Sequence, residues 1–136
     1  MKNACKLLGC IRGASAVEFA LLAPVFLTML FGIIEGSRMF WMKQALDEIA
    51  YSTARCMSVS SACDTVTNQQ AFATGRAAGY GLRIATADVV LAANVTCRGQ
   101  PAGNSVTVSA PFNTALGQLL PMPTTVSATA CFPVLG

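Results

Sequence analysis

The stretch RGASAVEFALLAPVFLTMLFGII, residues 12–34, decides the fold. It opens with a basic residue and a glycine, continues as an apolar run, and holds one carboxylate, Glu18, near its start. Residues 14–34 would form about 31 Å of α-helix, which matches a hydrocarbon core of about 30 Å. A charge inside such a segment costs on the order of a few kcal/mol, so Glu18 calls for a specific partner. The stretch therefore predicts a membrane helix that carries one functional acid.

The distribution of charge predicts the orientation of this helix. The chain has 136 residues and a formal net charge of +3, and the excess lies before Gly13, in Lys2, Lys6 and Arg12. After Gly13, six basic side chains meet six acidic ones. Positive flanks stay in the cytoplasm, so we expect the N-terminus inside and the rest of the chain exported. The basic balance is thus a topology signal, and no nucleic-acid partner is expected.

Two other kinds of N-terminal signal fit less well. Leu7-Leu8-Gly9-Cys10 resembles a lipoprotein cleavage box, but the apolar core follows the cysteine instead of preceding it. An ordinary secretory signal lacks a small-x-small site after Ile34 in a suitable setting. The segment is therefore either an uncleaved anchor or the stem of a protein cut before it.

Beyond the membrane segment the sequence predicts a second, amphipathic half of the same helix, to about Val59. Arg38 and Trp41 suit the membrane–water boundary. Lys43 and Asp47, four residues apart, can pair weakly. The apolar stripe follows a three–four spacing and is expected to pack on the exported domain; its members are Met39, Met42, Leu46, Ile49, Ala50, Thr53 and Met57.

The remainder predicts one more helix and three strands. A helix over Gln69–Gly79 is expected, capped by Asn68. Strands are expected over residues 87–98, 105–110 and 125–132, with a turn at 99–104 and a short helical crossover at 112–120. The predicted fold is α+β: a long N-terminal helix, with a membrane half and an exported amphipathic half, packed on a small three-stranded antiparallel sheet.

The six cysteines divide at the membrane segment. Two precede it, in a reducing compartment, and four follow it, where disulfides persist. Four cysteines allow three pairings. If the third strand runs parallel to the first, Cys97 and Cys131 lie at the same end of the sheet, which leaves Cys56 to pair with Cys63.

Catalytic chemistry finds no support in the sequence. The chain has no histidine, which removes the usual nucleophile–base pairs, and no glycine-rich phosphate loop. The exported cysteines lack the short spacing of structural zinc sites. We therefore expect no enzyme activity, no metal and no cofactor.

The same residues carry a resemblance to a known family. Gly13, four small or apolar residues and Glu18-Phe19 look like the processing site of type IV prepilins. With the continuation GIIEGSR, residues 32–38, the segment resembles TadE-like pseudopilins of the Tad/Flp pilus system. The likeness is dense from Gly13 to about Arg55. It implies a pilin-like fold and a membrane peptidase that cuts between Gly13 and Ala14.

The resemblance also implies roles for residues of the stem. Glu18 would become fifth in the mature chain and meet the new ammonium of Ala14, its own or that of an adjacent subunit. The alternative is that Glu18 stays at the cytoplasmic interface and pairs with Arg12. Pro24 would break the helix so that the stem can stretch on assembly, or is simply tolerated there.

The function expected from this resemblance is that of a minor pilin or pseudopilin, trimmed by prepilin peptidase, in the initiation or tip assembly of a Tad/Flp adhesive pilus. Residues 1–13 would be the cytoplasmic leader, 14–36 the inner-membrane helix and 37–136 the periplasmic domain. Expected partners are TadF-like pseudopilins, the Flp major pilin and the inner-membrane assembly platform. The alternative is an uncleaved single-pass protein whose exported domain binds a component of the envelope.

Overall fold

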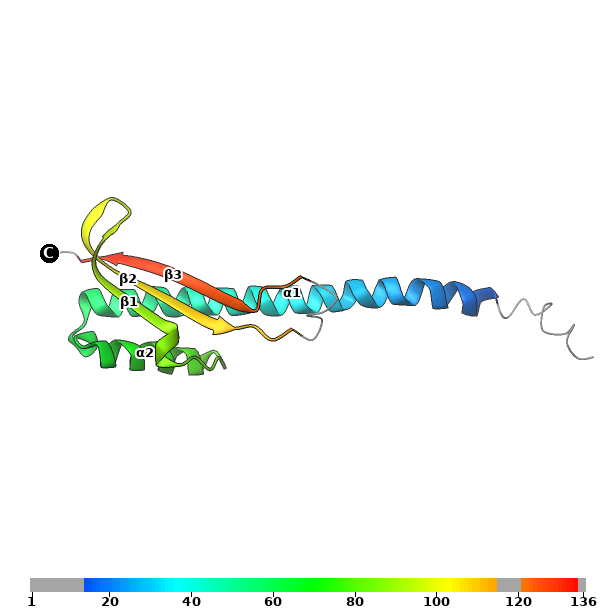
Figure 1. Cartoon of the computed structure of the whole chain (residues 1–136), viewed down its shortest axis with the longest axis horizontal. Coiled ribbons are helices and arrows are strands. Elements are labelled where there is room, and N and C mark those ends of the chain that lie inside the picture. The colour runs from blue at the N-terminus through cyan, green and yellow to red at the C-terminus, as the bar shows by residue number, and fades with distance from the viewer. Residues whose placement is uncertain (1–13, 115–120, 135–136) are drawn as a thin grey trace, which may run out of the picture. The chain divides into compact units, whose positions relative to one another are not determined.

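The computed structural model describes residues 14–114 and 121–134. It divides into two compact units, residues 1–36 and 37–136. The elements, labelled in Figure 1, are α1 (Ala14–Val59), η3 (Ser61–Cys63), α2 (Val66–Gly79), η4 (Thr86–Asp88), β1 (Val89–Cys97), β2 (Gln100–Pro111) and β3 (Thr125–Pro133).

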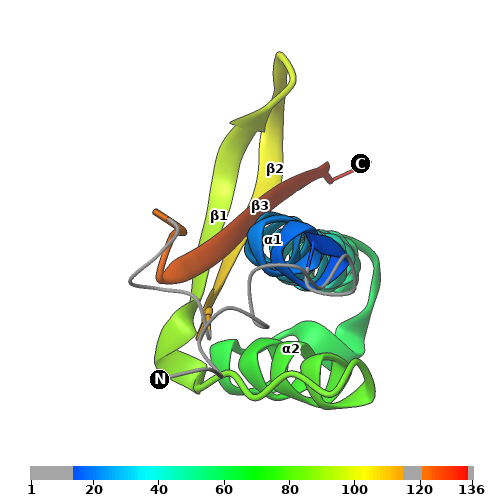
Figure 2. The same cartoon turned by 90° about the vertical axis from the view of Figure 1, so that its right-hand side faces the viewer.

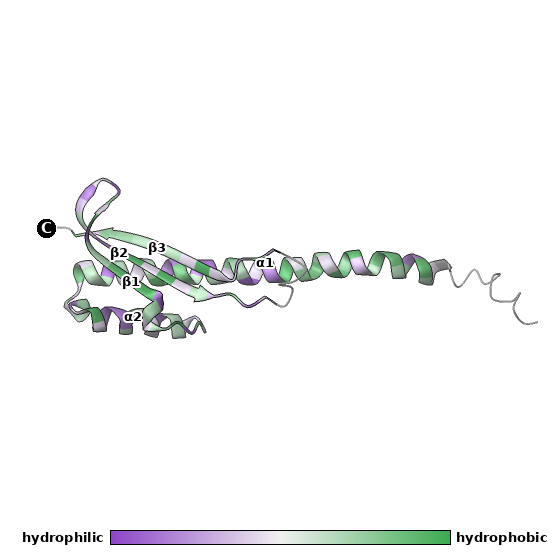
Figure 3. Cartoon of the chain, viewed as in Figure 1, coloured by the Kyte–Doolittle hydropathy of each residue, from purple (hydrophilic) through white to green (hydrophobic). Residues whose placement is uncertain are grey.

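Helix α1 confirms the expectation of one long N-terminal helix. It stays α-helical through Pro24, which leaves the carbonyl of Ala20 without its usual donor. The Thr28 hydroxyl donates a hydrogen bond to the Pro24 carbonyl. Among the described residues this is the one helix long and apolar enough to cross a membrane. Figure 3 shows the contrast between its apolar beginning and its mixed second half.

The three strands form one antiparallel sheet in the order β1-β2-β3, as expected. Both edge strands oppose β2, so β1 and β3 run in the same direction. The sequence placed the second strand at 105–110 and a turn at 99–104, and this was wrong at the start of β2. The turn is Arg98–Gly99, with φ values of 50° and 85°, and β2 begins at Gln100. Register shifts in β1 between Ala92 and Cys97 allow this early pairing.

The core of the second unit lies where α1, the sheet and α2 meet. The sheet and α2 lie on different sides of α1 (Figures 1 and 2). The apolar stripe of α1 is confirmed as its contribution, with Leu46 and Ile49 fully buried and the methionines packed around them. Thr53 is buried in the same stripe, and its hydroxyl donates to the carbonyl of Ile49 at 2.7 Å. Apart from the buried Phe112, the opposing buried side chains of the core cluster are small or β-branched: Ala73, Ala77, Val89, Val106, Val108, Ala110, Val126 and Ala128.

Helix α2 starts earlier than the sequence analysis expected. Its N-cap is Thr65, whose hydroxyl accepts a hydrogen bond from the backbone N–H of Asn68 at 3.3 Å. Asn68, expected as the cap, instead lies within the first turn, and its side chain donates to Asp64 at 3.2 Å. Both residue types are good caps, and here the hydroxyl of Thr65 holds the first turn. Of the crossover expected at 112–120, residues 112–114 are not helical and 115–120 lie outside the described residues.

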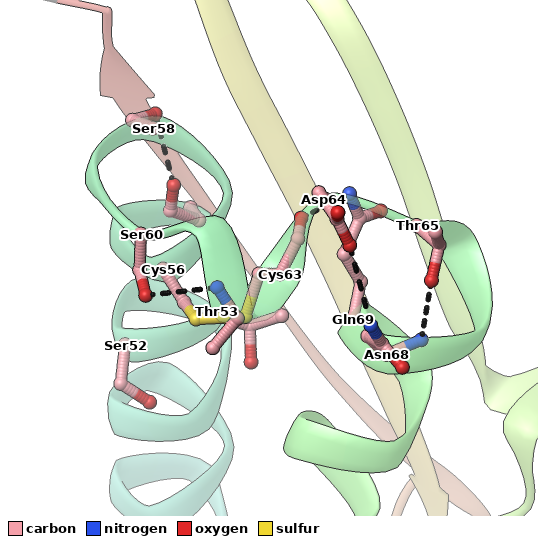
Figure 4. The surroundings of a disulfide bond; sticks show 12 residues. Ser52, Thr53, Cys56, Ser58, Ser60, Cys63, Asp64, Thr65, Asn68 and Gln69 are labelled. Atoms are coloured by element: carbon pink, nitrogen blue, oxygen red, sulfur yellow. Dashed lines mark hydrogen bonds between the residues drawn. A yellow bond between two sulfur atoms is a disulfide. The ribbon is translucent and has the colours of Figure 1, made fainter.

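Two disulfides brace this small core. Cys56–Cys63 joins the end of α1 to η3 (Figure 4), and Cys97–Cys131 joins the two edge strands β1 and β3. Because β2 lies between β1 and β3, the Cys97–Cys131 disulfide crosses over β2, and it does so at Gly103. A Cβ atom placed on Gly103 would overlap the Sγ of Cys97 and lie 2.9 Å from its Cβ. A glycine is thus required where the disulfide crosses β2.

The substitution Gly103→Ala should destabilise the full-length protein by about 1–3 kcal/mol, because the new methyl group overlaps the disulfide. Thermal unfolding of the oxidised protein in detergent micelles measures this as a lower Tm. The matched control is Gly75→Ala in α2, where a new Cβ meets no atom within 4 Å. Because alanine favours a helix over glycine, that variant should keep or raise the Tm.

The cause of the loss can be separated from a general intolerance at this position. In a Cys97→Ala/Cys131→Ala background the obstructing sulfur is gone, so Gly103→Ala should cost clearly less there. An equal drop in Tm in both backgrounds would contradict the proposed crossing.

Candidate functional site

The first candidate site is the beginning of α1, around Glu18. Glu18 is exposed, and so are its apolar neighbours Val17 and Phe19, whose exposed fractions are 61% and 73%. Within the described part of the chain, Glu18 forms no ion pair. On a helix that spans a membrane, exposed apolar side chains face lipid or other helices, whereas an acid faces other helices or a water-filled cavity. The helix therefore presents an acid on an apolar surface that the described residues of its own chain leave uncovered.

The expected cleavage site borders this acid. Ala14 is the first residue of α1, and one helical turn separates it from Glu18. An amino group at Ala14 would lie on the same face of the helix as the carboxylate, since residues four apart are neighbours. Gly13 and the basic residues Lys2, Lys6 and Arg12 lie outside the described residues.

Three charged side chains of α1 in the second unit take part in exposed ion pairs. Lys43 pairs with Asp47 at 2.8 Å, as expected, and also donates to the backbone carbonyl of Ser127 on β3 at 3.0 Å. Glu48 accepts from Arg76 of α2 at 3.3 Å. Each contact links the long helix to a neighbouring element or to itself.

Near the Cys56–Cys63 disulfide (Figure 4), hydrogen bonds from side-chain hydroxyl and amide groups link the elements at this end of the domain. The Ser58 hydroxyl accepts from the side-chain amide of Asn104 at 3.0 Å, which ties α1 to β2. The Gln69 amide donates to the carbonyl of Cys63 at 2.8 Å, which ties α2 to η3. In the described residues no group of three or more acids or cysteines is arranged to hold a metal ion.

A pocket of about 580 Å³ lies at the other end of the domain. Its lining comes from the part of α1 that begins the second unit, the segment after α2 and the end of β2 with the residues that follow: Ser37, Arg38, Trp41, Met42, Tyr80, Gly81, Leu82, Pro111, Phe112 and Asn113. The guanidinium carbon of Arg38 lies 5.8 Å from the centre of the Phe112 ring. We refer to this site as the juxtamembrane pocket.

The sequence analysis identified only part of this pocket. Arg38 and Trp41 closely follow the apolar run, and the sequence analysis predicted them at a membrane boundary. Tyr80 and Phe112 are distant in the sequence and reach the pocket only through the packing of α2 and β2. The one local signal for Tyr80 is the glycine on either side of it, which marks the end of a helix.

Comparisons with known proteins identify the N-terminal part of the chain. A search of curated proteins and a search of solved structures found no match. Residues 13–55 match the family model described as TadE-like protein, which confirms the resemblance drawn from the sequence. The matched segment holds Ala14, Glu18, the whole apolar stem and most of the helical stripe that enters the core. Through residues 13–55 the chain is similar to TadE-like proteins, consistent with a protein associated with the Tad pilus system.

Proposed function

We propose that the chain is a minor pilin or pseudopilin that acts in the initiation or tip assembly of a Tad/Flp-type adhesive pilus. The observation that carries this proposal is the TadE-like match over residues 13–55, which runs from the proposed cut into the exported domain. Prepilin peptidase would cut between Gly13 and Ala14. The protein is then a substrate of an enzyme and not an enzyme.

Before assembly the protein is held in the bacterial inner membrane by residues 14–36. Lys2, Lys6 and Arg12 keep the N-terminus in the cytoplasm, and the domain of residues 37–136 folds in the periplasm. An oxidising compartment of this kind also suits the two disulfides of the domain. The partners are TadF-like pseudopilins, the Flp major pilin and the inner-membrane assembly platform.

Glu18 has the central role in this proposal. An ionised carboxylate among lipid-facing side chains is costly unless an opposite charge answers it at close range. Cleavage after Gly13 creates an ammonium group at Ala14, one turn away. The same group on a neighbouring subunit can pair with Glu18 and so fix how far one subunit is displaced along the next.

The first prediction concerns the N-terminus of the mature protein. Intact-mass measurement of the protein purified from membranes of cells that express the pilus system should give a chain starting at Ala14. The variant Gly13→Leu, which alters the residue at the cut, should accumulate as the precursor. The control Gly32→Ala alters a glycine in the same segment with open space around it, and its processing should be normal.

The alternative function gives the opposite result in this experiment. A single-pass envelope protein that binds its ligand without assembly into a pilus would keep residues 1–13. A membrane form that still begins at Met1 in piliated cells would therefore exclude the processed pilin.

The second prediction concerns the assembly charge. Glu18→Ala should leave membrane insertion, disulfide formation and the stability of the domain unchanged but abolish pilus assembly, counted by electron microscopy and by sheared pilus protein. Glu48→Ala is the matched control, because Glu48 is an exposed acid on the same helix within the second unit. Normal piliation with Glu18→Ala would remove this residue from its proposed role.

A further inference from the structure

The juxtamembrane pocket begins where the proposed membrane span ends. Along α1, Arg38 and Trp41 follow Gly36 by two and five residues, or about 3 Å and 8 Å of helix. The polar headgroup layer adds about 5–8 Å to each side of the hydrocarbon core. If the core ends near Gly36, both side chains stand at the depth of the lipid headgroups.

The lining of the pocket has the composition of a membrane interface. Trp41 is 62% exposed and Tyr80 is also exposed, although both are large and partly apolar. Rings with one polar atom favour the headgroup level, where one end is apolar and the other wet. The volume of about 580 Å³ is in the range of small-molecule sites.

The formal charge of the described lining residues is positive, which favours an anionic ligand. Among the described residues that line it, Arg38 carries a formal positive charge and none is acidic. The Phe112 ring lies 5.8 Å from its guanidinium carbon, and this cation–π contact helps to keep the group at the pocket. A guanidinium binds phosphate through two parallel hydrogen bonds. The exposed Arg83, next to Leu82 of the lining, adds positive charge at the rim.

We propose that the juxtamembrane pocket binds the headgroup of an anionic phospholipid from the leaflet nearest the domain. Arg38 holds the lipid phosphate, and Trp41 and Tyr80 contact the glycerol region. This inference rests on the membrane anchorage in the proposed function, and it is independent of processing and of pilus assembly. A bound headgroup at this place would fix the depth at which the domain sits.

The chain contains a single tryptophan, so its fluorescence reports on this pocket alone. The full-length protein is reconstituted into vesicles of phosphatidylcholine and phosphatidylglycerol in equal amounts. Two vesicle preparations are compared, each with a spin label near the top of an acyl chain that quenches tryptophan fluorescence. In one preparation the phosphatidylglycerol is labelled, and in the other the phosphatidylcholine is labelled. The quenching of Trp41 should correspond to a local concentration of phosphatidylglycerol about fivefold above that of phosphatidylcholine. A factor of about five is what one basic residue contributes at an anionic membrane surface.

Variants of the arginine test the assignment. Arg38→Gln should remove the preference for the anionic lipid, and Arg38→Lys should keep part of it, because the charge remains without the two parallel hydrogen bonds. The matched control is Arg55→Gln, an exposed arginine near the other end of the same helix, which should keep the full preference. Unchanged Tm values of the variants verify that the domain is folded.

Flotation of the vesicles separates the possible failures. If the protein does not float with them, both the membrane anchor of the proposed function and this inference are wrong. If it floats but both labelled lipids quench Trp41 equally, or Arg38→Gln keeps the preference, the anchor stands and the lipid site is wrong. A Trp41 that neither lipid quenches would show that the pocket is closed to lipid, which also overturns the inference.

Discussion

The packing of α1 against the sheet and against α2 is the constraint on which the domain depends. Leu46 and Ile49 are completely buried, and each contributes about 1.5–3 kcal/mol by leaving water. Their partners on β2, Val106 and Val108, are equally buried. The buried side chains of the sheet, the stripe of α1 and the α2 residues Ala73 and Ala77 belong to one core cluster. Everything else in the domain is arranged around it.

The core is small, and covalent links compensate for its size. Most side chains that α2 and the sheet add to it are alanine or valine, which bury little area each. Domains of this size bury a smaller share of their surface than large ones do. The Cys97–Cys131 bridge closes a 34-residue interval, for which the chain-entropy model gives about 3–4 kcal/mol. The requirement for glycine at position 103 follows from that link.

The helical parts of the fold could be predicted from the sequence because their signals are local. The three–four spacing from Met39 to Met57 sets which side of α1 is buried, and no other element is needed to interpret it. The start of β2 could not be predicted, because Gln100–Asn104 is typical of turns and only the shifted pairing with β1 makes it a strand. The expected cap of α2, Asn68, was wrong: the helix begins at Val66 and is capped by Thr65.

The same distinction applies to the sites. Glu18 stands out in the sequence because an acid in an apolar run is a local anomaly. Only part of the juxtamembrane pocket could be predicted from the sequence. Arg38 and Trp41 closely follow the apolar run, whereas Tyr80 and Phe112 reach the pocket only through tertiary packing. The reason for Gly103 could not be predicted: the sequence analysis expected the Cys97–Cys131 bridge but placed Gly103 in a turn, and not in the strand that the bridge crosses.

The bridge between β1 and β3 also determines how the domain answers a mechanical load. Tension applied between the stem and the C-terminus would pass through the sulfur atoms to β1, and the 34 residues between Cys97 and Cys131 would not be drawn out. That shields about 110–120 Å of contour length from extension. Under such a load the domain can extend only through the residues before Cys97 and after Cys131, and its last strand is kept from being pulled free or exchanged with a neighbouring molecule.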